Sequence, residues 1–415
     1  MSDRVVDVVV SLDGVDLEAG TLYSHRRGRT ESATFLYTRE YVTTRGAYRL
    51  DPLLPLGMAP SQTAVGRTLF GALSDCAPDR WGRTLIARAE ARTAREEGRP
   101  PRSLGDVDYL LGVRDDLRQG ALRFRVGGGP FLSPDDVGVP VLTDLPELVA
   151  LADAAERDDV SLPDLKRLVR VGSSLGGARP KAHVRDTDGR VAIAKFPSAA
   201  HDTWNVMAWE KVALDLAHSA GVDVMPSRLL DLAGRHVLVV DRFDRTTDGG
   251  RVGYVSAMTM LEAGDGDQRS YLEIAEVVEE TSARATRELE QLWRRVVFNV
   301  LISNTDDHLR NHGFLHSGGT SWSLAPAFDL NPDPAPGPKH LSTAIDTGDD
   351  TASVALAMSV APMFRLSAAD AGRVLREVAA AVRPWREVAA RWLTPTEVER
   401  MAPAFAELDA VPGAL

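Results

Sequence analysis

LISNTDDHLRNHGFLHSGGTSWSLAPAFDL, residues 301–330, combines three polar residues at spacings that point to one kind of chemistry. Asp306 stands five residues before Asn311, and Asp329 directly follows the apolar Phe328. Phosphoryl transfer needs one carboxylate that accepts the proton of the attacking hydroxyl. It also needs an amide and a second carboxylate that hold metal ions at the phosphates. The segment therefore predicts a phosphoryl-transfer site in which Asp306 is the base.

The spacing of Asp306 and Asn311 is that of the protein-kinase catalytic loop, H-R-D-x-x-x-x-N, in which both residues come from one turn. Here the histidine, His308, follows the aspartates, so the sequence does not contain the ordinary form of that loop. Asp and Asn also gather in solvated turns, and an Asp five residues before an Asn occurs by chance in most chains of this size. On this loop alone both interpretations stay open.

The composition restricts the class of protein. A chain of 415 residues has room for two or three domain-sized units, and 44% apolar with 26% charged residues is typical of globular proteins. A net charge of −11 argues against direct nucleic-acid binding and is compatible with a basic protein partner. The single cysteine, Cys76, fits a reducing compartment, and no apolar run resembles a signal peptide or a membrane span. We expect a cytoplasmic protein that does not bind membranes.

Patterns of apolar residues divide the chain into three parts. Residues 1–130 alternate short apolar runs with turn signals such as Asp13-Gly14, which favours a β-rich N-terminal subdomain interrupted by a helix over 80–97. Residues 145–245 carry a helix, a Gly-rich turn, strands and another helix, as a kinase N-lobe would, and 246–415 are mostly apolar at helical spacing. This order predicts an α+β, two-lobed protein-kinase-like fold with an α-helical C-terminal lobe.

A Gly-rich turn in VGSSLGGARPKAHV, residues 171–184, could bring backbone N–H groups close to phosphates because Gly lacks a Cβ. Lys181 follows the turn and is one of only five lysines in a chain that otherwise uses Arg. Since a lysine binds phosphate as a compact point charge, its retention fits a phosphate site, although chance retention would look the same. The turn matches neither standard nucleotide-binding motif, so an ordinary loop between a helix and a strand is the alternative.

The next segment, GRVAIAKFP (189–197), is an alternating strand whose Lys195 can face a nucleotide, as in the V-A-I-K strand of kinases. Glu210 follows fifteen residues later in a helical stretch. There it could form the ion pair that holds the lysine on the α- and β-phosphates, or it could be an ordinary helix-surface carboxylate. A further strand, HVLVVDRFDR (236–245), is placed to contact adenine through its backbone.

As an ordered set these pieces make the chain similar to the HipA family of serine/threonine kinases, the toxins of bacterial type II toxin–antitoxin pairs. The resemblance covers nearly the whole chain. The segments that carry it are LPLG (54–57), FGALSDCAPDRWGR (70–83), DYLLGVRDDLRQGALRF (108–124), SSLGGARPKA (173–182), AIAKFP (192–197), VDRFDR (240–245), TDDHLRN (305–311) and APAFDL (325–330).

The resemblance implies a role for each matching position. Asp306 would be the catalytic base, and Asn311 and Asp329 would bind Mg²⁺. Lys195 would be the nucleotide-binding lysine with Glu210 as its partner. The remaining nucleotide contacts would come from the glycine loop, the hinge and the catalytic-loop histidine, that is from Gly176, Gly177, Ala178, Lys181, Asp241, Phe243 and His308. His308 would orient the loop rather than accept a proton.

The resemblance also implies regulation and partners. Ser174 matches the serine whose autophosphorylation ejects the glycine loop, with Ser173 as the alternative site; a phosphoserine would add negative charge where ATP phosphates otherwise lie. We expect ATP and Mg²⁺ as cofactors and a HipB-like DNA-binding antitoxin as partner. The substrate would be a protein, for which an aminoacyl-tRNA synthetase is one class that the resemblance allows.

Three departures from the family pattern bear on substrate choice and ATP affinity. Asp307 stands where a small residue is common, Arg179-Pro180 precedes Lys181, and the hinge begins with Asp241 rather than Glu. Two other functions stay open. One is a small-molecule phosphotransferase on a kinase-like fold, and the other is a non-catalytic co-repressor that acts with the antitoxin on DNA.

Overall fold

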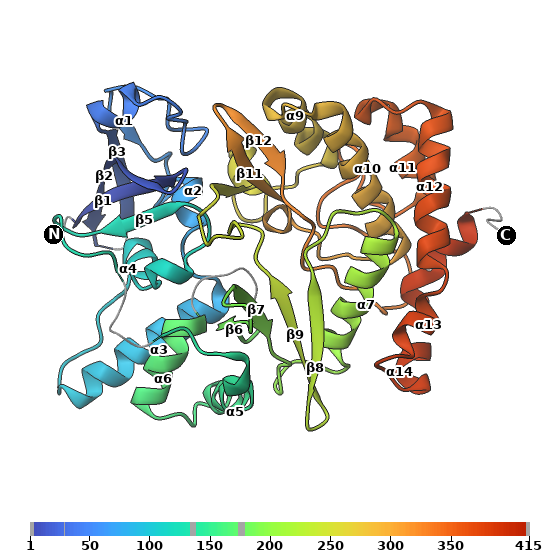
Figure 1. Cartoon of the computed structure of the whole chain (residues 1–415), viewed down its shortest axis with the longest axis horizontal. Helices are drawn as coiled ribbons and strands as arrows, with labels where there is room; N and C mark the ends of the chain where they lie inside the picture. Colours follow the sequence, from blue (N-terminus) through green and yellow to red (C-terminus); the bar gives the residue numbers. More distant parts are fainter. Residues whose placement is uncertain (1–3, 29, 133–137, 173–178, 412–415) are drawn as a thin grey trace. The chain divides into compact units, whose positions relative to one another are not determined.

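The computed structural model describes residues 4–28, 30–132, 138–172 and 179–411. By its contacts the chain forms two compact units, both of which mix helices and strands (Figure 1). The N-terminal unit comprises residues 1–201, 241–255 and 318–320, and the C-terminal unit comprises residues 202–240, 256–317 and 321–415.

The N-terminal unit contains a five-stranded sheet with the order β4-β3-β2-β1-β5. Its strands are β1 (Arg4–Leu12), β2 (Val15–Arg27), β3 (Thr30–Tyr37), β4 (Ser61–Gln62) and β5 (Leu122–Arg125). The pairs are antiparallel, and β1 and β2 are joined by Asp13-Gly14. Both residues of this turn have positive φ, 49° and 78°, which a two-residue hairpin turn of the I′ type requires. The predicted turn and the β-rich nature of this segment are confirmed.

One face of this sheet is the core of the unit. Val6, Val8 and Val10 alternate along β1 and are fully buried, as expected when one face of a strand packs inward. On β3 the ring of Phe35 meets the ring of Phe70 edge to face, with the ring centroids 6.4 Å apart. The hydrophobic pattern of the first forty residues therefore fixes which face is covered.

Helices and a second strand pair complete the N-terminal unit. The helices are α1 (Arg39–Thr43), α2 (Gly71–Ser74), α3 (Arg80–Glu96), α4 (Asp106–Leu111), α5 (Leu145–Glu156) and α6 (Leu162–Gly172), with 3-10 turns η1 (Asp115–Leu117) and η2 (Leu142–Asp144). Strands β6 (Lys181–Arg185) and β7 (Val191–Lys195) form an antiparallel pair. The predicted helix over 80–97 is confirmed by α3.

The two units cut across the three parts that the sequence suggested. Helix α3, from the predicted subdomain 1–130, packs against α6, from the predicted N-lobe 145–245, so both belong to one unit. The pattern of apolar residues marks elements well, but it does not say which elements pack together, and the boundaries at 130 and 245 are not those of the units.

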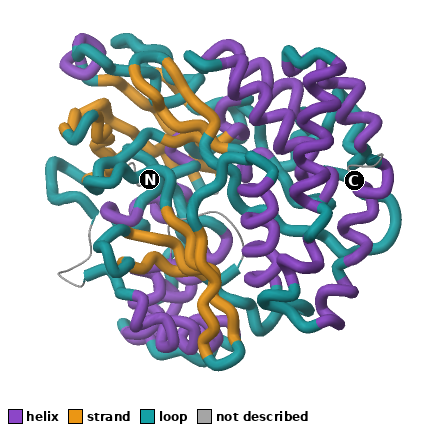
Figure 2. Tube along the Cα trace, turned by 45° about the vertical axis from the view of Figure 1, so that its right-hand side comes forward, coloured by secondary structure: helices purple, strands orange, loops and turns teal. Residues whose placement is uncertain are grey.

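The C-terminal unit is mainly helical, and Figure 2 shows its helices (purple) with few strands (orange) among them. Its helices are α7 (Val206–Ser219), α8 (Ala257–Met260), α9 (Tyr271–Thr281), α10 (Ala285–Leu301), α11 (Val354–Val360), α12 (Ala368–Val382), α13 (Trp385–Ala389) and α14 (Pro395–Arg400), with 3-10 turns η3 (Leu309–Asn311), η4 (Ala361–Phe364) and η5 (Ala402–Ala410). Its strand pairs are β8 (Ser227–Leu232) with β9 (Arg235–Asp241), and β11 (Gly313–Gly318) with β12 (Ser321–Leu324). The short strand β10 (Tyr254–Ser256) lies where the chain passes between units.

Helix α10 runs through the core of the C-terminal unit. Leu292, Trp293 and Val296 are fully buried. The indole of Trp293 donates a hydrogen bond to the carbonyl of Ala357 at 3.1 Å. This burial holds the end of α10, from which the loop over 302–312 leaves. No helix in the described part of the chain is both long and apolar enough to cross a membrane.

Candidate active site

The end of α10 fixes where the candidate catalytic loop begins. After Leu301, the backbone of Ser303 adopts the left-handed conformation with φ 50°, which ends the helix. The backbone N–H of Asn304 then donates to the backbone carbonyl of Asn299 at 2.8 Å. The chain therefore leaves a buried helix at one defined residue, and the loop that follows starts from a rigid base.

Two buried asparagines connect this loop with the segment that carries Asp329. The side-chain amide of Asn304 donates to the side-chain oxygen of Asn299 at 3.1 Å. The side-chain oxygen of Asn304 accepts the backbone N–H of Asn331, also at 3.1 Å. Because each asparagine uses both a donor and an acceptor, the loop and the segment after Asp329 are held at a fixed separation.

Asp306 and Asn311 are joined by a hydrogen bond. The side-chain amide of Asn311 donates to the backbone carbonyl of Asp306 at 2.8 Å, and the 3-10 turn η3 closes with the N–H of Asn311 on the carbonyl of His308, also at 2.8 Å. The side chain of Asp306 is exposed, while Asn311 is half-buried. The five-residue spacing read from the sequence thus corresponds to a turn that brings the two residues together.

Asp307 behaves differently from its neighbour, because it is buried. Its carboxylate accepts the hydroxyl of Tyr271 at 2.5 Å and the N–H of Thr343 at 3.3 Å. Burial raises the pKa of Asp307 to about 7, although these hydrogen bonds oppose the increase. Burial and the adjacent carboxylate likewise raise the pKa of Tyr271 well above its usual value. The sequence showed Asp307 only as a departure from a family pattern.

The two histidines of the loop have separate surroundings. The Nε2 of His312 lies 3.1 Å from the carbonyl oxygen of Asp307, to which only a protonated nitrogen can donate. Burial lowers the pKa of His312 to about 3, so the ring is neutral and carries its single proton on Nε2. The Nδ1 of His308 is buried and, among the described residues, has no hydrogen-bond partner. His308 therefore presents an unused polar atom within the loop.

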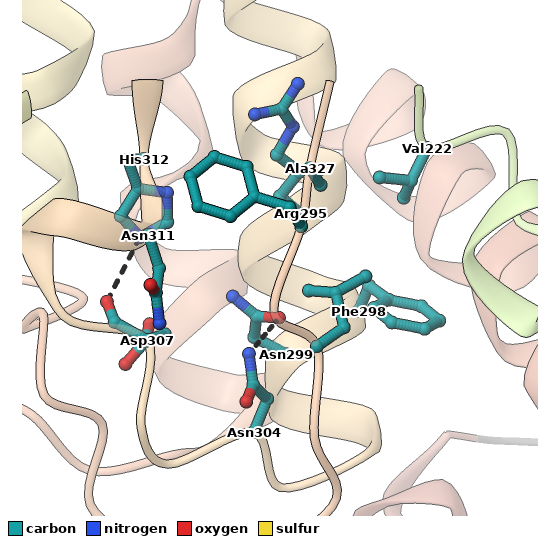
Figure 3. A pocket seen from close by; sticks show the side chains of 11 residues that line it. Val222, Arg295, Phe298, Asn299, Asn304, Asp307, Asn311, His312 and Ala327 are labelled. Carbon is teal, nitrogen blue, oxygen red and sulfur yellow. Dashed lines mark hydrogen bonds between the residues drawn. The ribbon is translucent and has the colours of Figure 1, made fainter. Parts of the chain in front are cut away.

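A small cavity of about 10 Å³, close to the space of one water molecule, adjoins these residues. Figure 3 shows Asn299 and Asn304 hydrogen-bonded to each other beside it, with Asp307, Asn311 and His312 along its wall. Its lining residues are Val222, Arg295, Phe298, Asn299, Asn304, Asp307, Asn311, His312, Ala327, Phe328 and Leu330. Asn311 and Phe328 thus line the same cavity, which brings the residue before Asp329 to the catalytic loop.

Backbone contacts fix the segment that carries Asp329. The guanidinium of buried Arg295 donates to the carbonyl of Ala325 at 2.6 Å, and the N–H of Ala327 donates to the carbonyl of Asp223 at 2.7 Å. Asp329 itself has a left-handed backbone with φ 58°. Asp tolerates this conformation better than most residues other than glycine, so the backbone of this segment can turn at Asp329.

Asn311 and Asp329 carry side-chain oxygens of the kind that magnesium binds. The hydrogen bond from the amide nitrogen of Asn311 to Asp306 leaves its side-chain oxygen as an acceptor, and Asp329 supplies a carboxylate. Mg²⁺ is usually bound by one or two carboxylates plus substrate phosphates rather than by a closed protein cage. In the part of the chain that the structure describes, no three His, Cys, Asp or Glu side chains converge as a metal site of their own.

The nucleotide-binding residues expected from the sequence lie mostly in the N-terminal unit. Lys195 ends β7 and stands directly opposite Lys181 of β6. The ammonium of Lys181 forms a buried ion pair with Asp79 at 2.7 Å, a partner that the sequence did not suggest. Glu210 lies on α7 of the C-terminal unit and is buried rather than a surface carboxylate.

The hinge residues and the glycine loop complete the predicted set. Asp241 lies 3.6 Å from the guanidinium of Arg190, and the ring of Phe243 lies 5.7 Å from that of Tyr254. Five predicted residues lie outside the described part of the chain, namely Ser173, Ser174, Gly176, Gly177 and Ala178.

The segment after the hinge takes part in a buried ion network that the sequence did not predict. The carboxylate of Asp244 accepts hydrogen bonds from Arg242 at 2.6 and 2.8 Å, from Arg245 at 2.8 Å and from the N–H of Gly120 at 2.7 Å. Burial alone would raise the pKa of Asp244, but the two arginines lower it far below its usual range.

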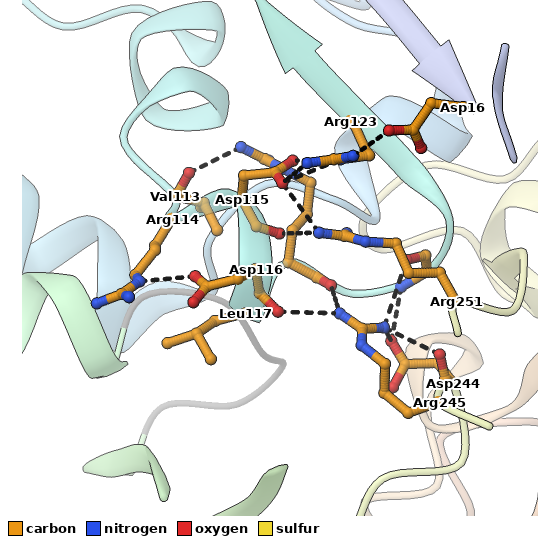
Figure 4. A network of polar contacts seen from close by, with 12 residues as sticks. Asp16, Val113, Arg114, Asp115, Asp116, Leu117, Arg123, Asp244, Arg245 and Arg251 are labelled. Atoms are coloured by element: carbon orange, nitrogen blue, oxygen red, sulfur yellow. Dashed lines mark hydrogen bonds and ion pairs between the residues drawn. The ribbon is translucent and has the colours of Figure 1, made fainter. Parts of the chain in front are cut away.

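Figure 4 shows that this network continues to the N-terminal sheet. Asp115 accepts hydrogen bonds from Arg123 on β5 at 2.7 Å and from Arg251 at 3.0 Å. The motifs DYLLGVRDDLRQGALRF and VDRFDR therefore meet in space, and their charged residues hold the segment after the hinge against the sheet within one unit.

Comparisons with known proteins identify relatives of this chain. A model of the family described as "HipA-like C-terminal domain" matches residues 173–386. The protein named "Putative kinase Y4mE" of Sinorhizobium fredii is 25% identical over 324 residues, which is 71% of each chain. A second protein of that organism, "Putative kinase Y4dM", is 29% identical over 153 residues, covering 33% of this chain and 36% of its own.

Among solved structures, HipA in the Shewanella oneidensis MR-1 complex of the toxin–antitoxin proteins HipA and HipB with their operator DNA has a TM-score of 0.68. The two sequences are 16% identical, and the match covers 98% of this chain and 96% of that one. At this identity the likeness concerns the fold, and it confirms the α+β, protein-kinase-like fold that the sequence predicted.

Proposed function

The chain belongs to the family with a HipA-like C-terminal domain, and we propose that it is an ATP-dependent protein kinase that phosphorylates Ser or Thr hydroxyls. The observation that carries this proposal is the pairing of an exposed carboxylate with a fixed amide. Asp306 is exposed, and its backbone carbonyl accepts a hydrogen bond from the side-chain amide of Asn311 at 2.8 Å. A kinase requires this combination, since its base must reach the substrate and its metal ligand must not move.

In the proposed reaction a protein hydroxyl attacks the γ-phosphorus of ATP, the bond to the β-phosphate oxygen breaks, and ADP leaves. Asp306 accepts the proton of the attacking hydroxyl. Asn311 and Asp329 would hold magnesium, which supplies positive charge at the phosphates. His308, whose Nδ1 is buried without a hydrogen-bond partner among the described residues, would orient the loop. Lys195 would contact the α- and β-phosphates, with Glu210 as its partner.

The proposal extends to regulation and biological role. Ser174, or its neighbour Ser173, would be the autophosphorylated residue of a loop over Gly176, Gly177, Ala178 and Lys181 that covers the ATP phosphates. We further propose that the protein is the cytoplasmic toxin of a type II pair. Its partner would be a HipB-like DNA-binding antitoxin, because the structurally similar Shewanella protein is found in a complex with HipB and operator DNA.

Mass spectrometry of the purified chain after incubation with Mg–ATP tests the activity. Phosphate on the chain itself or on an added protein from a cell extract, absent in the Asp306→Ala variant, would support a protein kinase. ATP hydrolysis that needs a small-molecule acceptor and leaves every protein unmodified would instead support a small-molecule phosphotransferase. ATP-independent binding to an antitoxin–DNA complex, with no phosphate transfer, would support a co-repressor.

A further inference from the structure

Asp306 and Asp307 are adjacent but have opposite surroundings. The side chain of Asp306 is exposed, whereas Asp307 is only 1% exposed. The carboxylate of Asp307 accepts hydrogen bonds from Tyr271 and from the N–H of Thr343, and its backbone carbonyl accepts from the hydroxyl of Thr343 at 2.7 Å and from His312 at 3.1 Å. Four hydrogen bonds thus converge on one residue of a loop.

The partners of Asp307 are themselves held in place. The hydroxyl of Tyr271 accepts the side-chain amide of Asn299 at 2.9 Å, and the N–H of Tyr271 donates to the carbonyl of Ala344 at 2.8 Å. Tyr271, Asn299 and Thr343 are almost completely buried. Since a buried carboxylate is costly unless it is fully hydrogen-bonded, an arrangement of this kind is rigid.

Hydrogen bonds hold the backbone at Asp306, the proposed base, and at the residue that follows it. The peptide carbonyl of Asp306 is fixed by Asn311, and the residue that follows is fixed by Tyr271, Thr343 and His312. The backbone on both sides of the Asp306 side chain is therefore held in place. Proton acceptance depends on such placement, because small displacements of a catalytic group reduce rates by large factors.

We propose that Asp307 is a positioning residue of the phosphoryl-transfer reaction, which holds the backbone of Asp306 in catalytic geometry through Tyr271 and Thr343. This inference rests on the proposed role of Asp306 as the base. It assigns a function to the residue that departs from the family pattern. It also predicts that the clamp, by which we mean the hydrogen bonds from Tyr271 and Thr343 to Asp307, matters for turnover rather than for ATP affinity.

Tyr271→Phe removes the hydrogen bond to Asp307, and with it the one that the hydroxyl accepts from Asn299, while leaving the ring in place. Tyr41→Phe is the matched control, because Tyr41 is also buried and its hydroxyl donates to the carbonyl of Tyr48 at 2.9 Å, in the other unit. Both variants should lower the thermal unfolding midpoint to a similar extent. Only Tyr271→Phe should lower kcat, by about tenfold or more, with the KM for ATP unchanged. Equal kcat values for Tyr271→Phe, Tyr41→Phe and wild type would overturn the inference.

A double variant tests whether the clamp acts through the base. Adding Tyr271→Phe to Asp306→Ala should cause no further loss of residual kcat, since there is no base left to position. A further loss as large as that in the wild-type background would mean that Tyr271 acts by another route and would overturn the inference.

Hydrogen exchange separates failure of this inference from failure of the proposed function. In the absence of ATP, the amides of residues 305–311 should exchange faster in Tyr271→Phe than in wild type, and unchanged exchange would overturn the anchoring. A wild-type protein whose loop is anchored in this assay but which transfers no phosphate would overturn the proposed function, and with it the positioning role of Asp307.

Discussion

Lys181 and Lys195 stand directly opposite each other across the strand pair β6–β7. Residues at such positions place their side chains on the same face, and like charges there repel each other. The structure offsets this repulsion with Asp79, whose carboxylate lies 2.7 Å from the ammonium of Lys181 and whose side chain also caps α3. We therefore expect Lys195, rather than Lys181, to be the lysine on which ATP binding chiefly depends.

Substituting the two lysines separately should give opposite results. Lys181→Met leaves the buried Asp79 without its ammonium partner, which should lower the free energy of unfolding by about 3 kcal/mol with little effect on ATP affinity. Lys195→Met should weaken ATP binding by at least about tenfold. Urea unfolding and titration with a fluorescent ATP analogue measure the two quantities. Loss of ATP affinity in Lys181→Met at unchanged stability would assign the phosphate contact to Lys181 instead.

The ion network of Figure 4 contains its own control. Asp244→Asn should destabilise the protein by about 3–5 kcal/mol, because Arg242 and Arg245 are buried and lose the charge that compensates them. Asp116→Asn removes a pair that is buried only on the side of Arg114, since the Asp116 side chain is 42% exposed, and should therefore cost less than Asp244→Asn. Denaturant midpoints of the two variants provide the comparison. Similar losses in both would show that burial does not control the strength of these pairs.

His183 should make stability depend on pH. Burial, together with the nearby Arg242, lowers its pKa well below the usual value, and Asp244 only partly opposes this. The folded protein therefore keeps His183 neutral, while the unfolded chain binds a proton below about pH 6.5. As pH falls from 6.5 to 5, this residue should remove about 1.4 kcal/mol of stability per pH unit.

The control is His183→Gln, which keeps a hydrogen-bond donor for the carbonyl of Val171, the partner of the His183 Nδ1 at 3.0 Å. Between pH 6.5 and 5, the free energy of unfolding of His183→Gln should fall less steeply than that of wild type, by about 1.4 kcal/mol per pH unit. The difference between the two proteins is the relevant quantity, because the raised pKa of Asp307 gives stability that increases as pH falls over the same range. Parallel pH profiles for the two proteins would rule out His183 as the titrating group.

Two substitutions at Asp329 should separate charge from backbone conformation. Asn tolerates the left-handed backbone that Asp329 adopts, so Asp329→Asn should abolish phosphoryl transfer with stability nearly unchanged. Asp329→Ala should abolish activity as well and cost about 1–2 kcal/mol in the free energy of unfolding. Thermal or urea unfolding of both variants, beside an activity assay, checks this order. An active Asp329→Asn variant would remove this residue from the magnesium site.

The sequence predicted well those features that depend on neighbouring residues. The Asp13-Gly14 turn, the helix near 80–97, the helical pattern of 246–415, and the link between Asp306 and Asn311 all follow from residues a few positions apart. Such features arise from local backbone preferences and from periodic burial, both of which are written along the chain.

Long-range partners could not be predicted in this way. Tyr271 and Asp307 are 36 residues apart, Asp79 and Lys181 are 102 apart, and Gly120 and Asp244 are 124 apart. No periodic pattern connects the members of these pairs, and each is formed only when separate elements pack. The members of such buried pairs therefore stand in the sequence as isolated residues, and Asp307 stands there only as a departure from a family pattern.

The most direct test of the proposed kinase measures ATP binding and phosphate transfer on the same samples of wild type and Asp306→Ala. If Asp306 is the base, the variant should bind Mg–ATP with an affinity within about threefold of wild type, because the base does not hold the nucleotide. Its transfer of phosphate to Ser or Thr should fall by at least about 100-fold. Transfer at the wild-type rate in a folded Asp306→Ala protein would contradict the assignment.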